Sequence, residues 1–295
     1  MGGGVYTTNS FINYSTSVGK LYSATTGRVS GQVFTTNRLK EVMNPKGVIR
    51  ECANSKEHPN TIPVILGLDV TGSMGSACKE TAEALNVIMT KLYEKFKDIE
   101  FCIMGIGDFE CDDAPLQVSQ FESDVRIAQA IDNLYMEHGG GGNGYESYTA
   151  PWYFGLHNTK LDAYDEQDRK GIIITMGDEP LNPDLPKDYF KGYLGLKEVG
   201  SLETKNLYKE ASEKFDIYHI SINDSACNYD DPKDSYAKEV DESFIKVIGK
   251  DAYKVSTIDN LSKTIVECIS NSLQSSGKAK TQASVQKNDN GEIVW

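Results

Sequence analysis

The feature that most constrains this chain is a regular alternation, from residue 61 onward, of short apolar runs with amphipathic segments. Runs such as VILGLDV (64–70) and GIIITM (171–176) are apolar at almost every position, which is typical of strands buried on both faces of a parallel sheet. Between the runs, apolar residues recur every three or four positions, as they do on one face of a helix. Strands that alternate with helices need crossover connections, which place helices on both sides of the sheet. The alternation therefore predicts an α/β, doubly wound, Rossmann-like fold with a mostly parallel six-stranded sheet.

The predicted elements follow the same pattern to residue 273. Strands are expected at 64–70, 101–107, 116–121, 171–176, 216–223 and 252–256. Helices are expected near 78–97, 125–134, 148–161, 202–214, 236–247 and 261–273. The first strand should be central, whereas the short strand 116–121 follows a polar turn and is expected to be an antiparallel edge strand.

Composition divides the chain into three segments. Residues 1–60 are rich in Gly, Ser, Thr and Asn and show no sustained period, so we expect an N-terminal arm or extension, with SGQVFTTNRL (30–39) as its most strand-like piece. The main domain is predicted over 61–275, and a polar C-terminal tail over 276–295.

Charge and cysteine usage restrict the classes of partner and the compartment. A net charge of -13 opposes binding to nucleic acid or to an anionic membrane surface, because both need a basic footprint. The chain has no apolar run of 18 residues and no signal peptide, and its six cysteines are scattered, so we expect a cytoplasmic protein with reduced thiols. With only four histidines and no paired cysteines, any bound metal should be a hard cation with oxygen ligands.

Two loops carry oxygen-bearing side chains at the ends of predicted central strands. In DVTGSMG, residues Asp69, Thr71 and Ser73 alternate with Val70 and Gly72, so their side chains can converge on one side of a turning backbone. In MGDEP, Asp178 follows the strand 171–176. Ligands of open parallel sheets bind at the carboxyl ends of the strands, where both loops should lie. A helix cap at Thr71 or Ser73 and a turn-forming role for Asp178 are the simpler alternatives.

These two loops resemble the metal-ion-dependent adhesion site (MIDAS) of von Willebrand factor A-type (VWA) domains, and the resemblance covers about residues 61–275. It implies that Asp69, Thr71, Ser73 and Asp178 hold one Mg²⁺ or Mn²⁺. The two hydroxyls would be direct ligands, and the aspartates would act directly or through water. The resemblance also implies the strand order 3-2-1-4-5-6.

A third loop of the family normally contributes a threonine, and here this chain departs from the pattern. Its glycine-rich segment HGGGGNGYES contains no threonine; Asn143 is the nearest substitute, with Glu146 close behind. The segment is similar to a loop found in some intracellular VWA domains, so we include Asn143 and Glu146 as candidate ligands. Asp108, at the end of the strand 101–107, could reach the same edge, although capping of a turn is the simpler role.

The resemblance implies a cation-dependent protein-binding module. In that family the incompletely coordinated cation accepts an Asp or Glu from a protein partner, and intracellular members serve as adaptors or assembly factors, sometimes beside AAA+ ATPases. One alternative is a metal-assisted phosphoryl-transfer enzyme with Asp69 as nucleophile, although Thr71 stands where such enzymes use a second aspartate. A structural domain with a vestigial metal site is the other alternative.

Overall fold

A six-stranded sheet with the order β10-β9-β8-β4-β5-β6 forms the centre of the molecule. The computed structural model describes residues 4–137 and 144–283. The strands are β4 (Ile62–Asp69), β5 (Ile99–Ile106), β6 (Leu116–Val118), β8 (Gly171–Gly177), β9 (Phe215–Asn223) and β10 (Tyr253–Thr257). Every neighbouring pair is parallel except β5 and β6. The fold is therefore mixed α/β with a mostly parallel sheet, and numbered along the chain its strands have the predicted order 3-2-1-4-5-6.

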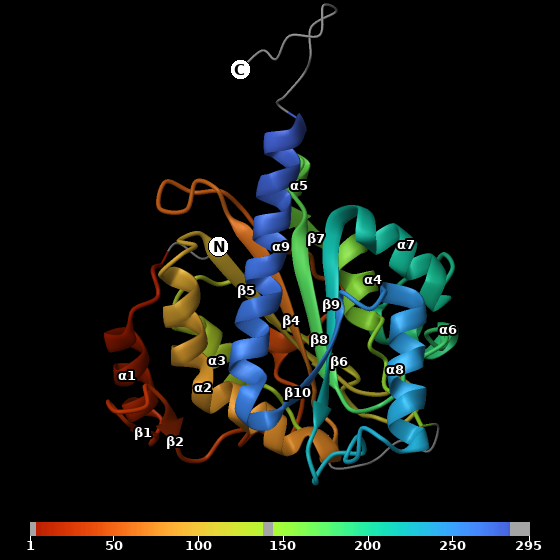
Figure 1. Cartoon of the computed structure of the whole chain (residues 1–295), viewed down its shortest axis with the longest axis horizontal. Helices are drawn as coiled ribbons and strands as arrows, with labels where there is room; N and C mark the ends of the chain where they lie inside the picture. Colours follow the sequence, from red (N-terminus) through yellow and green to blue (C-terminus); the bar gives the residue numbers. More distant parts are fainter. Residues whose placement is uncertain (1–3, 138–143, 284–295) are drawn as a thin grey trace, which may run out of the picture.

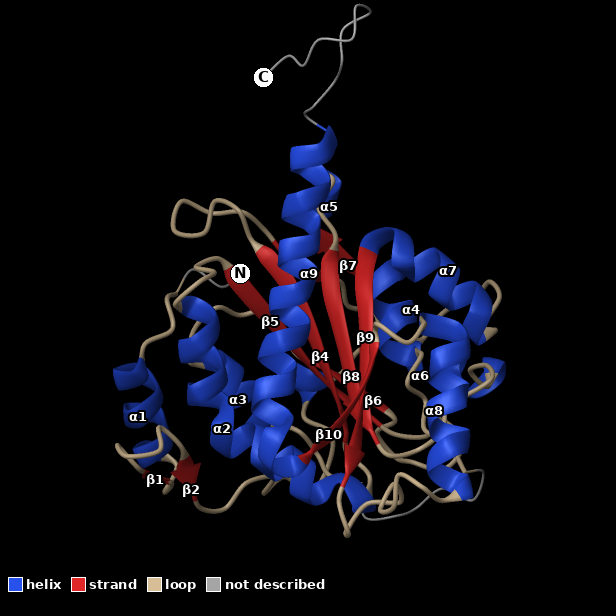
Figure 2. Ribbon diagram, in the orientation of Figure 1, coloured by secondary structure: helices blue, strands red, loops and turns tan. Residues whose placement is uncertain are grey.

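Helices cover both faces of this sheet (Figures 1 and 2). One face packs against α2 (Gly75–Tyr93), α3 (Arg126–Asp132) and α9 (Leu261–Ala283), and α1 (Thr8–Ser17) packs on the outer side of α2. The other face packs against α4 (Ala150–His157), α6 (Lys187–Leu194), α7 (Thr204–Lys214) and α8 (Ser235–Ile248). Because both faces are covered, the central strands are buried at nearly all positions, which explains their continuous apolar runs.

The first 60 residues are more regular than the sequence indicates. They form α1, a hairpin of β1 (Leu21–Tyr22) and β2 (Val29–Ser30), and β3 (Arg50–Cys52), which pairs with β7 (Thr159–Leu161). The piece 30–39, which is the most strand-like by sequence, is mostly irregular: Ser30 ends β2, and Thr36 forms an isolated bridge. Phe34 has a φ of 54°, in the left-handed region, which interrupts an extended backbone.

Four other features differ from the prediction. The segment 187–194, expected to be a loop, is helix α6, and the helix expected over 148–161 ends at His157. A short helix, α5 (Asp162–Asp165), follows β7. The closing helix α9 continues to Ala283, so the first part of the predicted tail (276–283) is helical.

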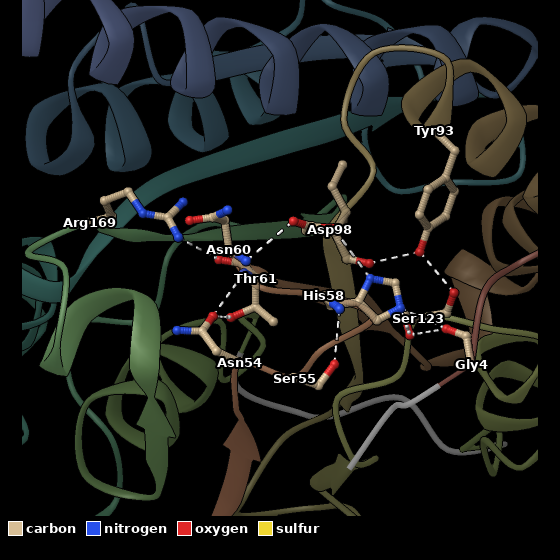
Figure 3. Close-up of polar contacts among 11 residues, drawn as sticks. Gly4, Asn54, Ser55, His58, Asn60, Thr61, Tyr93, Asp98, Ser123 and Arg169 are labelled. Carbon is tan, nitrogen blue, oxygen red and sulfur yellow. Dashed lines mark hydrogen bonds and ion pairs between the residues drawn. The ribbon is translucent and has the colours of Figure 1, made fainter.

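The N-terminal segment is attached at the amino ends of the central strands (Figure 3). His58 is 2% exposed and has its Nδ1 atom 3.4 Å from Asp98 Oδ1. Its Nε2 atom lies 2.9 Å from the carbonyl oxygen of Gly4 and 3.2 Å from Ser123 Oγ. The Ser123 hydroxyl also donates to the Gly4 carbonyl, at 2.6 Å. These contacts hold the start of the chain against β4, β5 and the segment that precedes α3.

Candidate functional site

The candidate site lies at the carboxyl ends of β4 and β8, which are adjacent strands in register from Val64 with Ile172 to Leu68 with Met176. The strand order changes direction between these two strands, because earlier strands extend to one side and later strands to the other. Loops that leave adjacent strands at such a point diverge and leave room for a ligand. The two oxygen-bearing loops predicted from the sequence both begin here.

The first loop is organised around Asp69, the last residue of β4, which is fully buried. Its Oδ1 atom accepts two hydrogen bonds from Thr71, one from the backbone N–H at 3.0 Å and one from the hydroxyl at 2.6 Å. Its Oδ2 atom accepts a hydrogen bond from the Tyr148 hydroxyl at 2.7 Å. A 3-10 turn, Gly72–Met74, then leads directly into α2. Both carboxylate oxygens of Asp69 are therefore fixed by donors.

The second loop places Asp178 opposite the first. Asp178 follows β8 and is fully buried. Its Oδ1 atom accepts a hydrogen bond from Ser73 Oγ at 3.1 Å, and its Oδ2 atom accepts one from the backbone N–H of Asn228 at 2.5 Å. The four predicted residues thus form two hydrogen-bonded pairs, Thr71 with Asp69 and Ser73 with Asp178, and the two pairs are close enough for the charge of Asp178 to act on Asp69.

The acidic side chains of this site have no basic partner among the described residues. None of the ion pairs found among the described residues involves Asp69, Glu146 or Asp178. Burial, and after it the charge of Asp178, raises the pKa of Asp69 to about 7. Burial likewise raises the pKa of Asp178 above its ordinary value. Bringing both carboxylates together in this position costs free energy that a cation would offset.

Glu146 belongs to the same acidic neighbourhood. It is 5% exposed, and its Oε2 atom has no hydrogen-bond partner. Burial raises the pKa of Glu146 to about 11, and the charges of Asp69, Asp112, Asp108 and Glu179 add to this effect. Glu146 also bridges to the backbone of Leu181, which joins the glycine-rich segment to the loop after β8. The other candidate from that segment, Asn143, lies outside the described residues.

Asp108 has the local role that the simpler alternative predicts. Its Oδ1 atom accepts a hydrogen bond from the backbone N–H of Glu110 at 3.0 Å, which caps the turn after β5. Its Oδ2 atom is buried and has no partner.

Sequence reasoning missed two contributors to this group. Tyr148 reaches Asp69 from a position just before α4, and no sequence pattern indicates that a tyrosine hydroxyl contacts a buried aspartate. Asn228 contributes its backbone N–H, for which the residue type is no guide. Glu179, beside Asp178, accepts hydrogen bonds from the Asn228 side chain and from the Tyr236 hydroxyl, which connects the site to the start of α8.

Two structural findings bear on metals and membranes. Within residues 4–137 and 144–283, no three His, Cys, Asp or Glu side chains are grouped so that they could hold a metal ion by themselves. Hydroxyl oxygens would therefore have to belong to any ligand set built on Asp69 and Asp178. Across the same described ranges, each helix is too short or too polar to traverse a bilayer.

Comparisons with known proteins add little to this geometry. No family model matches the chain, and no curated protein matches it. Among solved structures, it is similar to two crystal structures of the pilus adhesin SpaC from Lactobacillus rhamnosus GG. For the open conformation, the TM-score is 0.48 at 11% identity, and the match covers 78% of this chain and 31% of SpaC. For the second structure, the TM-score is 0.48 at 12% identity, with coverage of 78% and 32%. The chain thus spans about a third of the length of SpaC, and a likeness of this degree identifies neither its family nor its function.

Proposed function

We propose that this chain is a VWA-type domain, with the Rossmann-like topology of that family, that holds one Mg²⁺ or Mn²⁺ and binds a protein partner through the cation. The observation that carries the proposal is the arrangement of two hydroxyls and two buried acidic side chains that form no ion pair with any described basic residue. The Thr71 hydroxyl donates its hydrogen to Asp69, and the Ser73 hydroxyl donates its hydrogen to Asp178. Since a hydroxyl has one hydrogen and two lone pairs, each of these oxygens keeps its lone pairs for a cation.

The donor set fits a hard divalent ion. Hydroxyl, carboxylate and water oxygens are the ligands that Mg²⁺ prefers, and Mg²⁺ usually retains several waters when few protein ligands are present. Thr71 and Ser73 would hold the ion directly, whereas Asp69 and Asp178 would bind directly or through water and would supply the charge. Glu146 is included because its buried Oε2 atom has no hydrogen-bond partner and because the charge of Asp69 raises its pKa.

The proposed partner offers an Asp or Glu side chain to the open coordination position. A cation held by few direct protein ligands leaves such a position, and a carboxylate from another protein would complete the shell with a charge-assisted contact that confers specificity. The family resemblance adds AAA+ ATPase assemblies as one setting for such a partner.

Phosphoryl transfer is less compatible with these contacts. Enzymes of that class use a second aspartate as the acid, and here Thr71, whose hydroxyl donates to Asp69, occupies that position. Turnover of p-nitrophenyl phosphate that depends on Asp69 would favour the enzymatic alternative over the binding module.

The first prediction concerns the cation itself. Mg²⁺ or Mn²⁺ at about 100 times its Kd should stabilise the native protein by about 2.7 kcal/mol, which corresponds to a rise in Tm of roughly 4–5 °C. The Asp69→Ala variant should lose this rise when both proteins are melted with and without the cation at matched ionic strength. Asp132→Ala is the matched control, because Asp132 also accepts a hydrogen bond from a tyrosine, Tyr14, at 2.8 Å, but on α3. An equal rise for the wild type and Asp69→Ala would show that the site is assigned to the wrong residues.

The partner is tested by affinity capture in Mg²⁺ and again in EDTA. A protein retained by the wild type in Mg²⁺, and lost both in EDTA and with Asp69→Ala as bait, is the expected result. Substitution of single acidic residues in that protein should then abolish binding at one position. A domain that binds the cation but retains no such partner would correspond to the vestigial alternative.

A further inference from the structure

Tyr148 is the residue through which three loops of the site meet. Its side chain is fully buried, and its hydroxyl donates to Asp69 Oδ2 at 2.7 Å. The same hydroxyl oxygen accepts a hydrogen bond from the backbone N–H of Glu179 at 3.3 Å. Tyr148 itself follows the glycine-rich segment, so its single hydroxyl connects that segment to the loop after β4 and to the loop after β8.

The ring of Tyr148 is held in one orientation by its neighbours. It packs edge to face on His219, with ring centroids 5.0 Å apart, and is tilted against Phe244 at 5.7 Å. On its hydroxyl side it crosses Gly177, where an added Cβ atom would be 1.9 Å from the hydroxyl oxygen. Only glycine at position 177 leaves room for the hydroxyl to reach Asp69.

We propose that Tyr148 is a positioning residue of the cation site. This inference rests on the function proposed above. With Oδ2 of Asp69 bound to Tyr148, Oδ1 faces Thr71 and receives the hydrogen of the Thr71 hydroxyl. The lone pairs of Thr71 are thereby directed away from Asp69 and remain available to the ion. A hydrogen bond from a neutral hydroxyl to a carboxylate is among the stronger kinds in proteins, so Tyr148 fixes the rotation of this carboxylate without contacting the cation itself.

The test removes the hydroxyl and keeps the ring. Tyr148→Phe should bind Mn²⁺ about 10 to 100 times more weakly than the wild type in a calorimetric titration, which is the usual effect of losing a hydrogen-bond partner of a metal ligand. Tyr14→Phe is the matched control: it also removes a tyrosine hydroxyl that donates to an aspartate, Asp132, at 2.8 Å. It should bind Mn²⁺ as the wild type does.

Two further measurements separate positioning from a general loss of structure. At saturating Mn²⁺, the electron paramagnetic resonance line shape of the bound ion reports the symmetry of its ligands. It should change in Tyr148→Phe and stay unchanged in Tyr14→Phe. The circular dichroism spectrum without metal should be the same for all three proteins.

The outcomes distinguish this inference from the proposed function. If the wild type itself binds no Mn²⁺ or Mg²⁺, the proposed function fails and the positioning role fails with it. If the wild type binds Mn²⁺ and loses binding with Asp69→Ala, while Tyr148→Phe keeps both wild-type affinity and wild-type line shape, the site stands and Tyr148 has no positioning role.

Discussion

At the scale of single residues, the site depends on side chains that are small or absent as much as on those that carry oxygen. Gly177 ends β8 with no side chain, and the space that a Cβ atom would occupy is taken by the Tyr148 hydroxyl. Tyr148 is packed against aromatic rings and cannot retreat without moving His219 or Phe244. A substitution at 177 therefore affects Asp69 indirectly, through the tyrosine.

We predict that Gly177→Ala both destabilises the protein and weakens cation binding. Overpacking of a filled interior costs about 1–3 kcal/mol, and displacement of the Tyr148 hydroxyl removes its bond to Asp69. Urea unfolding in EDTA measures the first effect, and a Mn²⁺ titration measures the second. Gly192→Ala, within α6, is the control, because nothing lies within 4 Å of the added Cβ atom there. A Gly177→Ala protein with the wild-type free energy of unfolding would contradict the tight contact.

The local sequence indicated which acidic and hydroxyl side chains lie at this end of the sheet, but not the distant residue that hydrogen-bonds to them. Asp69, Thr71 and Ser73 lie within five residues, and their convergence follows from the turn at the end of one strand. Asp178 could be added because the carboxyl ends of parallel strands share one edge. Tyr148 could not be predicted, because its contact with Asp69 spans 79 positions and depends on the absence of a side chain at Gly177.

At the scale of elements, the central strands are buried so completely that one of them encloses a carboxyl group. β5 is buried at all eight positions, and one of these is Glu100, which is 2% exposed. Burial raises the pKa of Glu100 from its ordinary 4.5 to about 7, so the folded protein prefers the protonated side chain. The sequence prediction began this strand two residues later, at 101, because a glutamate does not fit an apolar run.

This burial predicts a pH dependence of stability. Since the pKa of Glu100 is higher in the folded than in the unfolded state, the protonated side chain contributes stability that is complete below about pH 4.5 and is lost as the pH rises through 7. Glu100→Gln should reduce the loss of unfolding free energy between pH 5 and pH 8 by roughly 1–3 kcal/mol, measured by urea unfolding in EDTA. Glu57→Gln, at an exposed position, is the control and should keep the wild-type pH dependence. Identical pH profiles for Glu100→Gln and the wild type would contradict the assignment.

Elements in which apolar residues form a continuous run or recur with a helical period were predicted. Elements that depend on tertiary contacts were not. The six strands of the sheet and the long helices follow from apolar runs and helical spacing. Helix α6 was missed because its sequence follows a loop rich in proline and glycine, although Phe190 and Leu194 are buried and Phe190 packs against Phe109 and Tyr153. Strand β7 was missed because it exists only through its pairing with β3, which lies more than 100 positions earlier in the chain.

At the scale of the whole molecule, the first 60 residues share a core with the sheet. Tyr6, Phe11, Val29 and Met43 are buried in the same apolar cluster as residues of α2, α9 and β4. The network around His58 attaches the start of the chain at the amino ends of β4 and β5 (Figure 3), whereas the proposed cation site lies at the carboxyl ends of β4 and β8. The arm expected from composition therefore shares its buried core with the domain that follows it.

A single substitution in α1 tests this integration. Phe11 is 1% exposed, so Phe11→Ala should lower the free energy of unfolding by about 3–5 kcal/mol, as truncation of a core phenylalanine does. Phe101→Ala, in β5, is the reference for a residue of the sheet and should cost a similar amount, since Phe101 is 2% exposed. Leu21→Ala is the opposite control, because Leu21 is 75% exposed and its truncation should leave stability nearly unchanged.

Calorimetry should give one transition for each protein, because a core shared by the N-terminal segment and the sheet unfolds as a unit. A separate, earlier transition in Phe11→Ala, with the main transition at the wild-type temperature, would show instead that the N-terminal segment folds independently of the sheet.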